Sequence, residues 1–310
     1  MTMSNDVQGV LWMLSHCFYV ALTMVIVRHL SVDLSSGQIL FFQNLFAVLM
    51  VVPWIIYKGG VQTQTEHFKL HLLRAFIGTV SMGIYFFVLT KIPLTQARAI
   101  ALSEPLVTSI LAIFILKETV GIHRISAIVI GMMGALIVLS PGNSHHAFSA
   151  YTLLAFVPVV MWGFSNVIIK KLSATEASTT QLLYLTTLMT ALSLPYALLD
   201  WKSDLDIRLL MWTAGLGVIF ALNVVAIFMA FKLAEVNVVM PFDFSGMIFT
   251  AILAFVIFGE VLTLNTIIGA TIIVAGSIYV LHRESLHRKA RLAGGGMPKK
   301  PWYRFKILSR

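Results

Sequence analysis

Three charged residues interrupt the long apolar stretches of this chain: Arg98, Glu104 and Asp243. A charge at the centre of a bilayer costs about 2.5–3.5 kcal/mol on insertion scales, so such residues normally face a cavity or a partner. Two carboxylates and one guanidinium in one place could hold the carboxylate and the amine of a zwitterionic solute. A carboxylate shielded from water could also exchange a coupling proton. The three residues therefore predict a transport site.

Each of these residues also has an alternative interpretation. Glu104 precedes Pro105 and could satisfy a backbone group freed by the proline, or could pair with Arg98. Asp243 also lies close to a proline, Pro241, and could have the same structural role. Arg98 is near enough to the interface to extend its guanidinium to water.

Amide and aromatic side chains inside the apolar stretches could complete the site. An aromatic ring holds a cation with about 0.5–2 kcal/mol, and a large amide in lipid needs several hydrogen-bond partners. Packing against lipid or neighbouring helices is the alternative. The candidates are Asn44, Asn166, Tyr85, Trp162, Phe242 and Phe244.

The composition identifies the solvent of this chain as a bilayer. Hydrophobic residues make up 58% of the chain and charged residues 11%, against about 25% charged residues in a soluble domain. Nine of the 22 Lys and Arg residues lie beyond residue 282, so the net charge of +9 belongs largely to a tail and does not indicate nucleic acid. The lone Cys17 excludes an intramolecular disulfide.

Ten apolar stretches are close to the length of about 20 residues that a helix needs to cross a bilayer. Helices are expected because an open strand edge would leave backbone groups unpaired in lipid. We therefore predict an all-α integral membrane protein with ten transmembrane helices. The expected spans are 8–27, 37–57, 72–90, 94–116, 122–140, 149–169, 178–199, 207–231, 236–258 and 263–281.

The second half of the sequence repeats the first at a shift of 142 residues without a gap. Pro53 then falls on Pro195, and Glu118 falls on Glu260. Five spans in each copy force the copies to insert upside down relative to each other, the arrangement typical of secondary transporters. The predicted units are a first repeat over 1–141, a second repeat over 142–282 and a basic cytoplasmic tail over 283–310.

Basic residues in the short loops predict the orientation. The side that holds the tail also holds eight loop residues, against five on the opposite side. Those eight are Lys58, Lys69, Arg74, Lys117, Arg124, Lys170, Lys171 and Lys232. We therefore expect both termini in the cytoplasm, with the tail able to rest on anionic lipid.

The second hairpin of each copy, a span, a glutamate and another span, resembles the EamA family of the drug/metabolite transporter superfamily. The residues that carry the resemblance run from Pro105 to Glu118 and from Pro241 to Glu260, each followed by a glycine-bearing span. The resemblance implies ten helices around a central cavity and transport of a small metabolite. The chain is also similar to the S-adenosylmethionine uptake branch of that family.

Catalytic, metal and phosphate-loop motifs are absent from the sequence. We therefore expect no enzyme activity, no cofactor and no resident metal. The expected function is secondary active transport of a small polar, amine-bearing metabolite across the bacterial cytoplasmic (inner) membrane. A proton or another coupling ion, membrane lipid and a second copy of the chain as a homodimer are the other expected partners. The alternatives are an exporter of drug-like or nucleoside-like solutes and a structural or sensory membrane protein.

Overall fold

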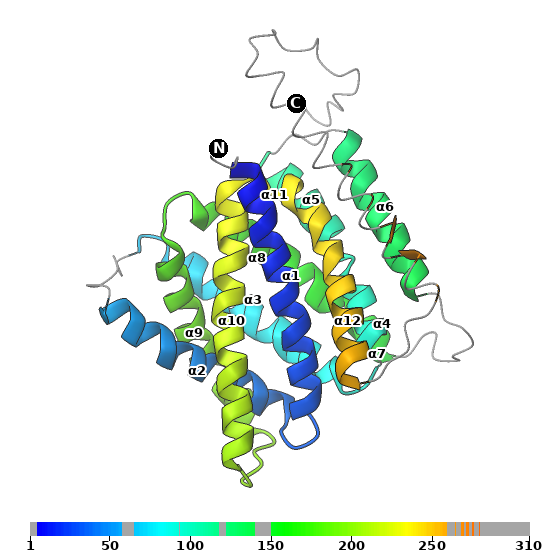
Figure 1. Cartoon of the computed structure of the whole chain (residues 1–310). Coiled ribbons are helices and arrows are strands. Elements are labelled where there is room, and N and C mark those ends of the chain that lie inside the picture. Colours follow the sequence, from blue (N-terminus) through cyan, green and yellow to red (C-terminus); the bar gives the residue numbers. More distant parts are fainter. Residues whose placement is uncertain are drawn as a thin grey trace.

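The computed structural model describes residues 5–57, 65–92, 94–117, 122–139 and 150–258, with isolated positions between 264 and 279. All regular structure in this part of the chain is helical (Figure 1). The elements are α1 (Asn5–Leu30), α2 (Ser36–Tyr57), α3 (Phe68–Leu89), α4 (Leu94–Ala101), α5 (Glu104–Ile115), α6 (Ile122–Leu139), α7 (Ala150–Leu154), α8 (Phe156–Ser173), α9 (Ser178–Leu198), α10 (Ile207–Leu233), α11 (Val236–Val239), the 3₁₀-helix η1 (Met240–Ser245) and α12 (Gly246–Phe258).

Six helical stretches in the described ranges are long and apolar enough to cross a membrane. They comprise α1, α2, α3, α7 with α8, α10, and η1 with most of α12. These stretches confirm an all-helical membrane protein, whereas the number ten remains a prediction. Most of the expected tenth span, and all of the tail over 283–310, lie outside the described residues.

Three of the expected spans are interrupted rather than continuous, and a proline follows or lies within each interruption. The span expected over 94–116 ends one helix at Ala101 and starts another at Glu104, with Pro105 in the first turn of the second. The span expected over 236–258 is divided among α11, η1 and α12, and Pro241 is the second residue of η1. The third break separates α7 from α8, where Pro158 follows. A proline ring clashes with the carbonyl four residues earlier, which explains these boundaries.

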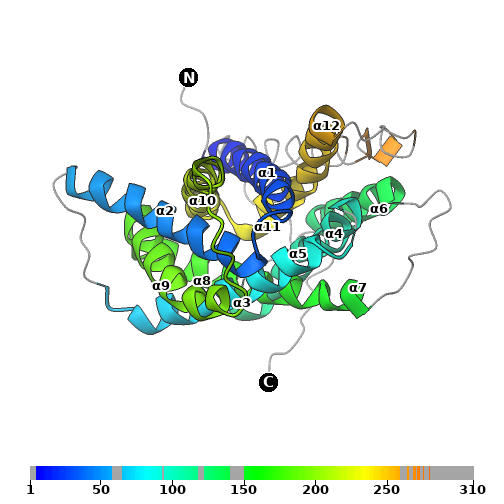
Figure 2. The same cartoon turned by 90° about the horizontal axis from the view of Figure 1, so that it is seen from below.

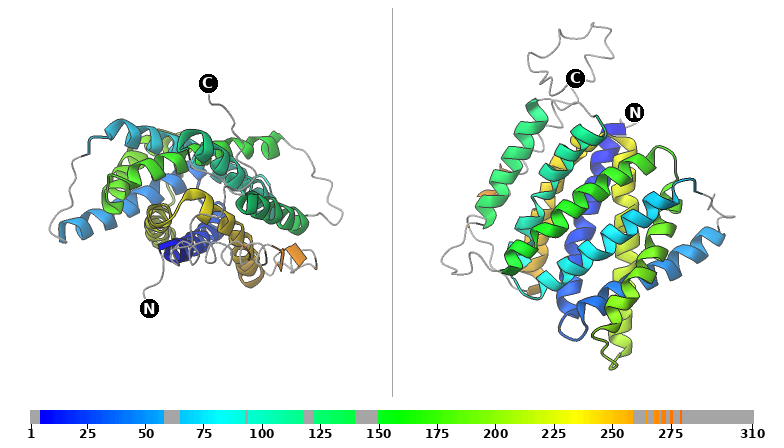
Figure 3. Two further views of the ribbon diagram at one scale, coloured as in Figure 1. Left: turned by 90° about the horizontal axis from the view of Figure 1, so that it is seen from above. Right: turned by 180° about the vertical axis from the view of Figure 1, so that it is seen from behind.

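The bundle divides into two sides when it is seen along the helices (Figures 2 and 3). Helices α1, α10 and α12 lie on one side, and α3, α8 and α9 lie on the other. Helix α1 packs on α10 and α12, and its repeat counterpart α8 packs on α3 and α5. Counterpart segments also meet directly, since α2 packs on α9 and the interrupted span α4–α5 packs on the interrupted span α11–η1–α12.

Helices related by the 142-residue shift run in opposite directions. Ser36 at the start of α2 bonds to Tyr196 near the end of α9, so these two counterparts are antiparallel. Lys170 near the end of α8 donates to the carbonyl of Phe231 near the end of α10, so α8 and α10 are parallel. The start of α1 contacts the end of α10 at Gly9, and α1 is therefore antiparallel to its counterpart α8.

Candidate functional site

The guanidinium of Arg98 and the carboxylate of Asp243 form an ion pair between the two copies of the repeat. Their Nη2 and Oδ1 atoms are 3.9 Å apart, and Nη2 also donates to the backbone oxygen of Asp243 at 3.3 Å. Arg98 is 4% exposed and Asp243 is 5% exposed. Both residues lie where a span is interrupted, because Arg98 is in the short helix α4 and Asp243 is in η1. Interrupted helices near the bilayer centre are where transporters bind their substrates and ions.

Gly246 makes room for the guanidinium of Arg98. A Cβ atom at this position would overlap Nη2 of Arg98. The absence of a side chain at the start of α12 therefore lets Arg98 reach across to Asp243. The 142-residue shift places Gly246 opposite Glu104 in the other copy. A carboxylate in one repeat thus corresponds to a position without a side chain in the other.

Glu104 makes a second contact between the copies. Asn166 of α8 donates from Nδ2 to Oε1 of Glu104 at 2.7 Å and to Oγ1 of Thr108 at 3.1 Å. Asn166 is buried, whereas Glu104 is half-buried at the start of α5. Of the three charged residues, Glu104 is therefore the one that a solute can reach without separating the ion pair.

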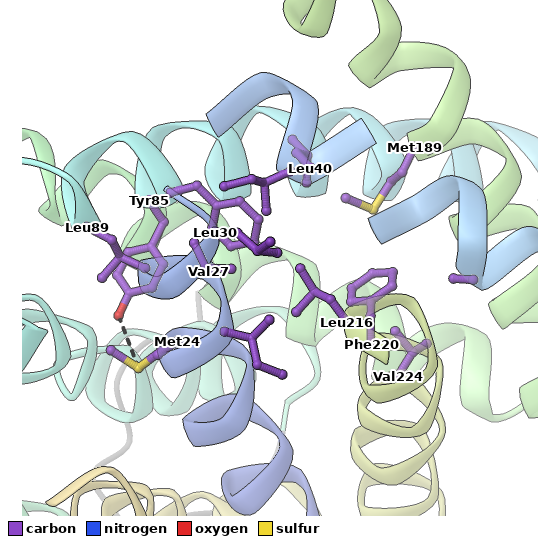
Figure 4. Packing of buried hydrophobic residues seen from close by; sticks show 14 of the residues in the cluster. Met24, Val27, Leu30, Leu40, Tyr85, Leu89, Met189, Leu216, Phe220 and Val224 are labelled. Atoms are coloured by element: carbon purple, nitrogen blue, oxygen red, sulfur yellow. Dashed lines mark hydrogen bonds between the residues drawn. The ribbon is translucent and has the colours of Figure 1, made fainter. Parts of the chain in front are cut away.

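Two predicted aromatic residues lie together beside these charges. The rings of Tyr85 in α3 and Trp162 in α8 meet edge to face, with centroids 4.9 Å apart. The hydroxyl of Tyr85 donates to Sδ of Met24 in α1 at 3.8 Å (Figure 4). Tyr85 is also within electrostatic reach of Arg98 and of both carboxylates. The pair thus provides an aromatic surface next to the charged cluster.

The other three predicted residues are placed differently. Phe242 is buried in an apolar cluster between α1 and α10, and Phe244 is buried in a separate cluster with Leu102 and Ile128. Their rings therefore pack in the protein interior, on either side of Asp243 in the sequence. Asn44 in α2 donates to the carbonyl of Leu40 in its own helix at 2.8 Å. The structure does not bring Asn44 to the charged cluster.

Two residues of the cluster were not among the candidates from the sequence. The thiol of Cys17 in α1 lies 3.6 Å from Oδ1 of Asp243, and this contact joins positions 226 residues apart. Thr108 lies one helical turn after Glu104, and that spacing of four residues was the available signal for it. No local pattern in the sequence indicates the position of Cys17.

The cluster has one more carboxylate than it has guanidinium groups. Arg98 and Asp243 balance each other, while the described partner of Glu104 is the neutral amide of Asn166. In a site of low dielectric constant, an unbalanced carboxylate favours binding of a cation. The arrangement can therefore bind an amine or another cationic group next to an aromatic surface.

These observations define a class: a helical membrane protein with charged groups held between two related halves. A sequence profile of the EamA-like transporter family matches the chain twice, over residues 7–140 and 149–282. The chain therefore belongs to the EamA-like transporter family, within the drug/metabolite transporter superfamily. It is a multi-pass membrane transporter and not an enzyme.

Curated relatives cover most of the chain at moderate identity. A riboflavin transporter of Vibrio cholerae is 29% identical over 285 residues, which is 91% of this chain and 95% of the relative. An S-adenosylmethionine uptake transporter of Rickettsia prowazekii is 26% identical over 280 residues, covering 89% and 93%. The pseudopaline exporter CntI of Pseudomonas aeruginosa is 23% identical, covering 87% and 94%. By name, these relatives include an uptake transporter and an exporter, and their solutes differ chemically.

One solved crystal structure supports the fold independently. It matches with a TM-score of 0.77 over 90% of this chain and 98% of its own length. Its sequence identity is 14%, so the likeness concerns the fold alone.

Proposed function

We propose that this transporter carries a small polar, amine-bearing metabolite, such as an amino acid or an S-adenosylmethionine-like solute, by secondary active transport. The observation that carries the proposal is the half-buried carboxylate of Glu104, which has no cationic partner in the described cluster. The amine or sulfonium of the solute binds Glu104. The carboxylate of the solute binds Arg98 in place of, or together with, Asp243.

In this proposal, alternating access arises from two inverted repeats of five helices, with boundaries near residues 141 and 282. The antiparallel directions of α1 and α8 and of α2 and α9 support this arrangement. The contact of Arg98 with Asp243 and that of Asn166 with Glu104 each join one repeat to the other. Rocking one repeat against the other would therefore open and close the site directly. A coupling proton would bind at Glu104, the carboxylate that retains access to solvent.

Uptake by purified protein in proteoliposomes tests the site and its solute. The panel should contain amino acids, S-adenosylmethionine and riboflavin, each supplied with and without a proton gradient. We expect Glu104→Gln to abolish uptake of the transported amine while the protein stays folded, because the neutral amide cannot balance the cation. Glu66→Gln, at an exposed position, is the matched control and should transport normally.

A second solute class is favoured by one observation. The edge-to-face pair of Tyr85 and Trp162 offers a ring surface for a flat heterocycle, and riboflavin is a solute of this kind. If riboflavin is taken up and Glu104→Gln leaves that uptake unchanged, the amine-bearing solute is wrong and the aromatic pair determines specificity.

Cysteine labelling tests the membrane topology. In a Cys17→Ser background, a cysteine at Asn143 and another in the tail over 283–310 should react from opposite faces, the tail from the cytoplasm. Both positions lie outside the described residues. Labelling of both cysteines from one face would exclude the inverted arrangement.

A further inference from the structure

A second buried charge lies away from the Arg98 cluster, near the starts of α3 and α9. Arg74 is in the second turn of α3 and is 3% exposed. Its expected place among the loop charges is wrong, because it lies inside α3. Its Nη1 atom donates to Oε1 of Gln181 in α9 at 2.9 Å. Gln181 is neutral and 0% exposed, so this contact does not compensate the charge of the guanidinium.

The nearest acidic side chain of this region is already engaged elsewhere. Glu176 accepts a hydrogen bond from the hydroxyl of Thr65 at one oxygen, and its other oxygen lies 2.6 Å from Nε2 of His71. Arg74 forms no ion pair within 4.0 Å among the described residues. A buried guanidinium thus lacks a carboxylate partner here, in contrast to Arg98.

Two hydrogen-bond donors at this place are also unused. Nε of Arg74 and Nε2 of Gln181 are both buried and have no hydrogen-bond partner in the described part of the chain. A buried donor without an acceptor is unfavourable, and a buried charge without a counterion is more so. One positive charge and two free N–H donors are together complementary to an oxyanion.

The symmetry-related place in the bundle shows that the fold does not require polar residues here. The 142-residue shift pairs Arg74 with Leu216 and Gln181 with Ile39. Both of these counterparts are 0% exposed and belong to the main apolar core (Figure 4 shows Leu216). Glu176 likewise corresponds to the buried Leu34. Apolar packing therefore suffices at one of the two symmetry-related places, and the polar pair at the other requires a separate explanation.

We propose that Arg74 and Gln181 form a binding site for a phosphate-type oxyanion, supplied either by an anionic lipid headgroup or by free phosphate. The planar guanidinium presents parallel N–H donors that match two oxygens of a phosphate group. Arg74 lies six residues into α3, about 9 Å along the helix axis from its start. That depth is within reach of a phosphate that enters where α3 and α9 begin.

Thermal unfolding of the delipidated full-length protein in neutral detergent tests the site. Three additions are compared: inorganic phosphate, phosphatidylglycerol, and diacylglycerol, which has no phosphate group, as the lipid control. Sodium chloride keeps the ionic strength constant. If free phosphate is the ligand, Tm should rise by about 3 °C at ten times its Kd. If the headgroup is the ligand, phosphatidylglycerol should raise Tm and phosphate alone should not.

The double variant introduces the residue types found at the counterpart positions, Leu216 and Ile39. Arg74→Leu with Gln181→Ile should keep the protein folded and remove the Tm rise, since Leu216 and Ile39 pack in the equivalent place. Arg74→Lys keeps the charge but loses the planar pair of donors, and should weaken binding by about tenfold. Arg208→Gln, at an exposed arginine, should respond as the wild type does.

Two results would overturn the proposal. One is a wild-type protein whose Tm does not change with either phosphate source. The other is an equal shift in Arg74→Lys and in the wild type, which would place the binding elsewhere on the surface. The Arg74→Lys comparison remains valid even if the double variant fails to fold.

Discussion

Two of the three interrupted spans of this transporter are counterparts in the repeat, yet they carry different groups at corresponding positions. The span α4–α5 has a guanidinium, a methyl group and a carboxylate where the span α11–η1–α12 has a thioether, a carboxylate and no side chain. The corresponding pairs are Arg98 with Met240, Ala101 with Asp243, and Glu104 with Gly246. Both spans are broken at similar places. What the copies share therefore shapes the fold, and what they do not share supplies the charges.

The same difference recurs near the starts of α3 and α9. Arg74 and Gln181 face each other, whereas their counterparts Leu216 and Ile39 are buried and apolar. A duplicated chain thus provides its own reference, because each position has a counterpart that the same fold has already accommodated. Substituting a residue by its counterpart separates the requirements of the fold from those of the site.

The largest effect is expected for Asp243→Ala, which gives η1 the alanine found at the counterpart position, Ala101. The guanidinium of Arg98 would remain buried without its carboxylate, and the free energy of unfolding should fall by about 3–5 kcal/mol. Unfolding in detergent, followed by fluorescence, measures this loss. The exposed Asp200→Ala is the control. An unchanged stability would show that the ion pair is not formed in the membrane.

Adding Arg98→Met to Asp243→Ala removes both charges and sharpens the comparison. Replacing a buried ion pair by apolar residues is often neutral, so the stability should return to within about 1 kcal/mol of the wild type. Uptake should remain absent, since the solute has lost Arg98. Normal uptake by this folded double variant would remove the ion pair from the transport mechanism.

Gly246→Ala should cost about 1–3 kcal/mol, because the added methyl group overlaps the guanidinium of Arg98. Gly215→Ala in α10 is the matched control, since nothing lies within 4 Å of its added Cβ. We expect the control to be neutral or slightly stabilising, as alanine favours a helix. Equal results for the two variants would mean that Arg98 does not occupy the place of the Gly246 side chain.

The smallest effect is expected for Asn166→Met, which introduces the counterpart residue Met24. Loss of the bonds to Glu104 and Thr108 should lower the stability by about 0.6–1.7 kcal/mol. In combination with Glu104→Gln, the losses should be less than additive, because the two side chains share one hydrogen bond. Additive losses would indicate that Asn166 and Glu104 act independently.

The sequence indicates the general fold well because lipid solvation is a property of whole segments. Apolar length predicts α1, α2, α3 and α10, and the repeat predicts that the α4–α5 and α11–η1–α12 spans have similar roles. Pro105 and Pro158 also gave a signal for the breaks, but a proline can be tolerated within a membrane helix, as Pro53 and Pro195 are here. The presence of a proline therefore does not show whether a membrane helix is continuous or interrupted.

The contacts of the site were less accessible to sequence reasoning. Arg98 and Asp243 were identified as candidates because charges are rare in apolar segments. The positions of Asn166 and Cys17 depend on how α8 and α1 rotate against the other repeat, and this is determined by packing between distant segments. Arg74 was counted with the loop charges because it lies near the end of the span predicted over 72–90, whereas α3 begins four residues earlier, at Phe68, and buries it.

The contacts of α2 with α9 and of the span α4–α5 with the span α11–η1–α12 place both pairs of counterparts on the pseudo-twofold axis that relates the copies. In the proposed cycle, each half adopts the conformation that the other half had before. A point on the pseudo-twofold axis keeps its position during this exchange. A solute held between Arg98 and Asp243 therefore stays at nearly the same depth while the walls around it change sides. Since the groups flanking the axis differ, the two openings need not hold the solute with equal strength. The solute concentration that half-saturates transport can therefore differ between the two faces, while the gradients set the direction of net flow.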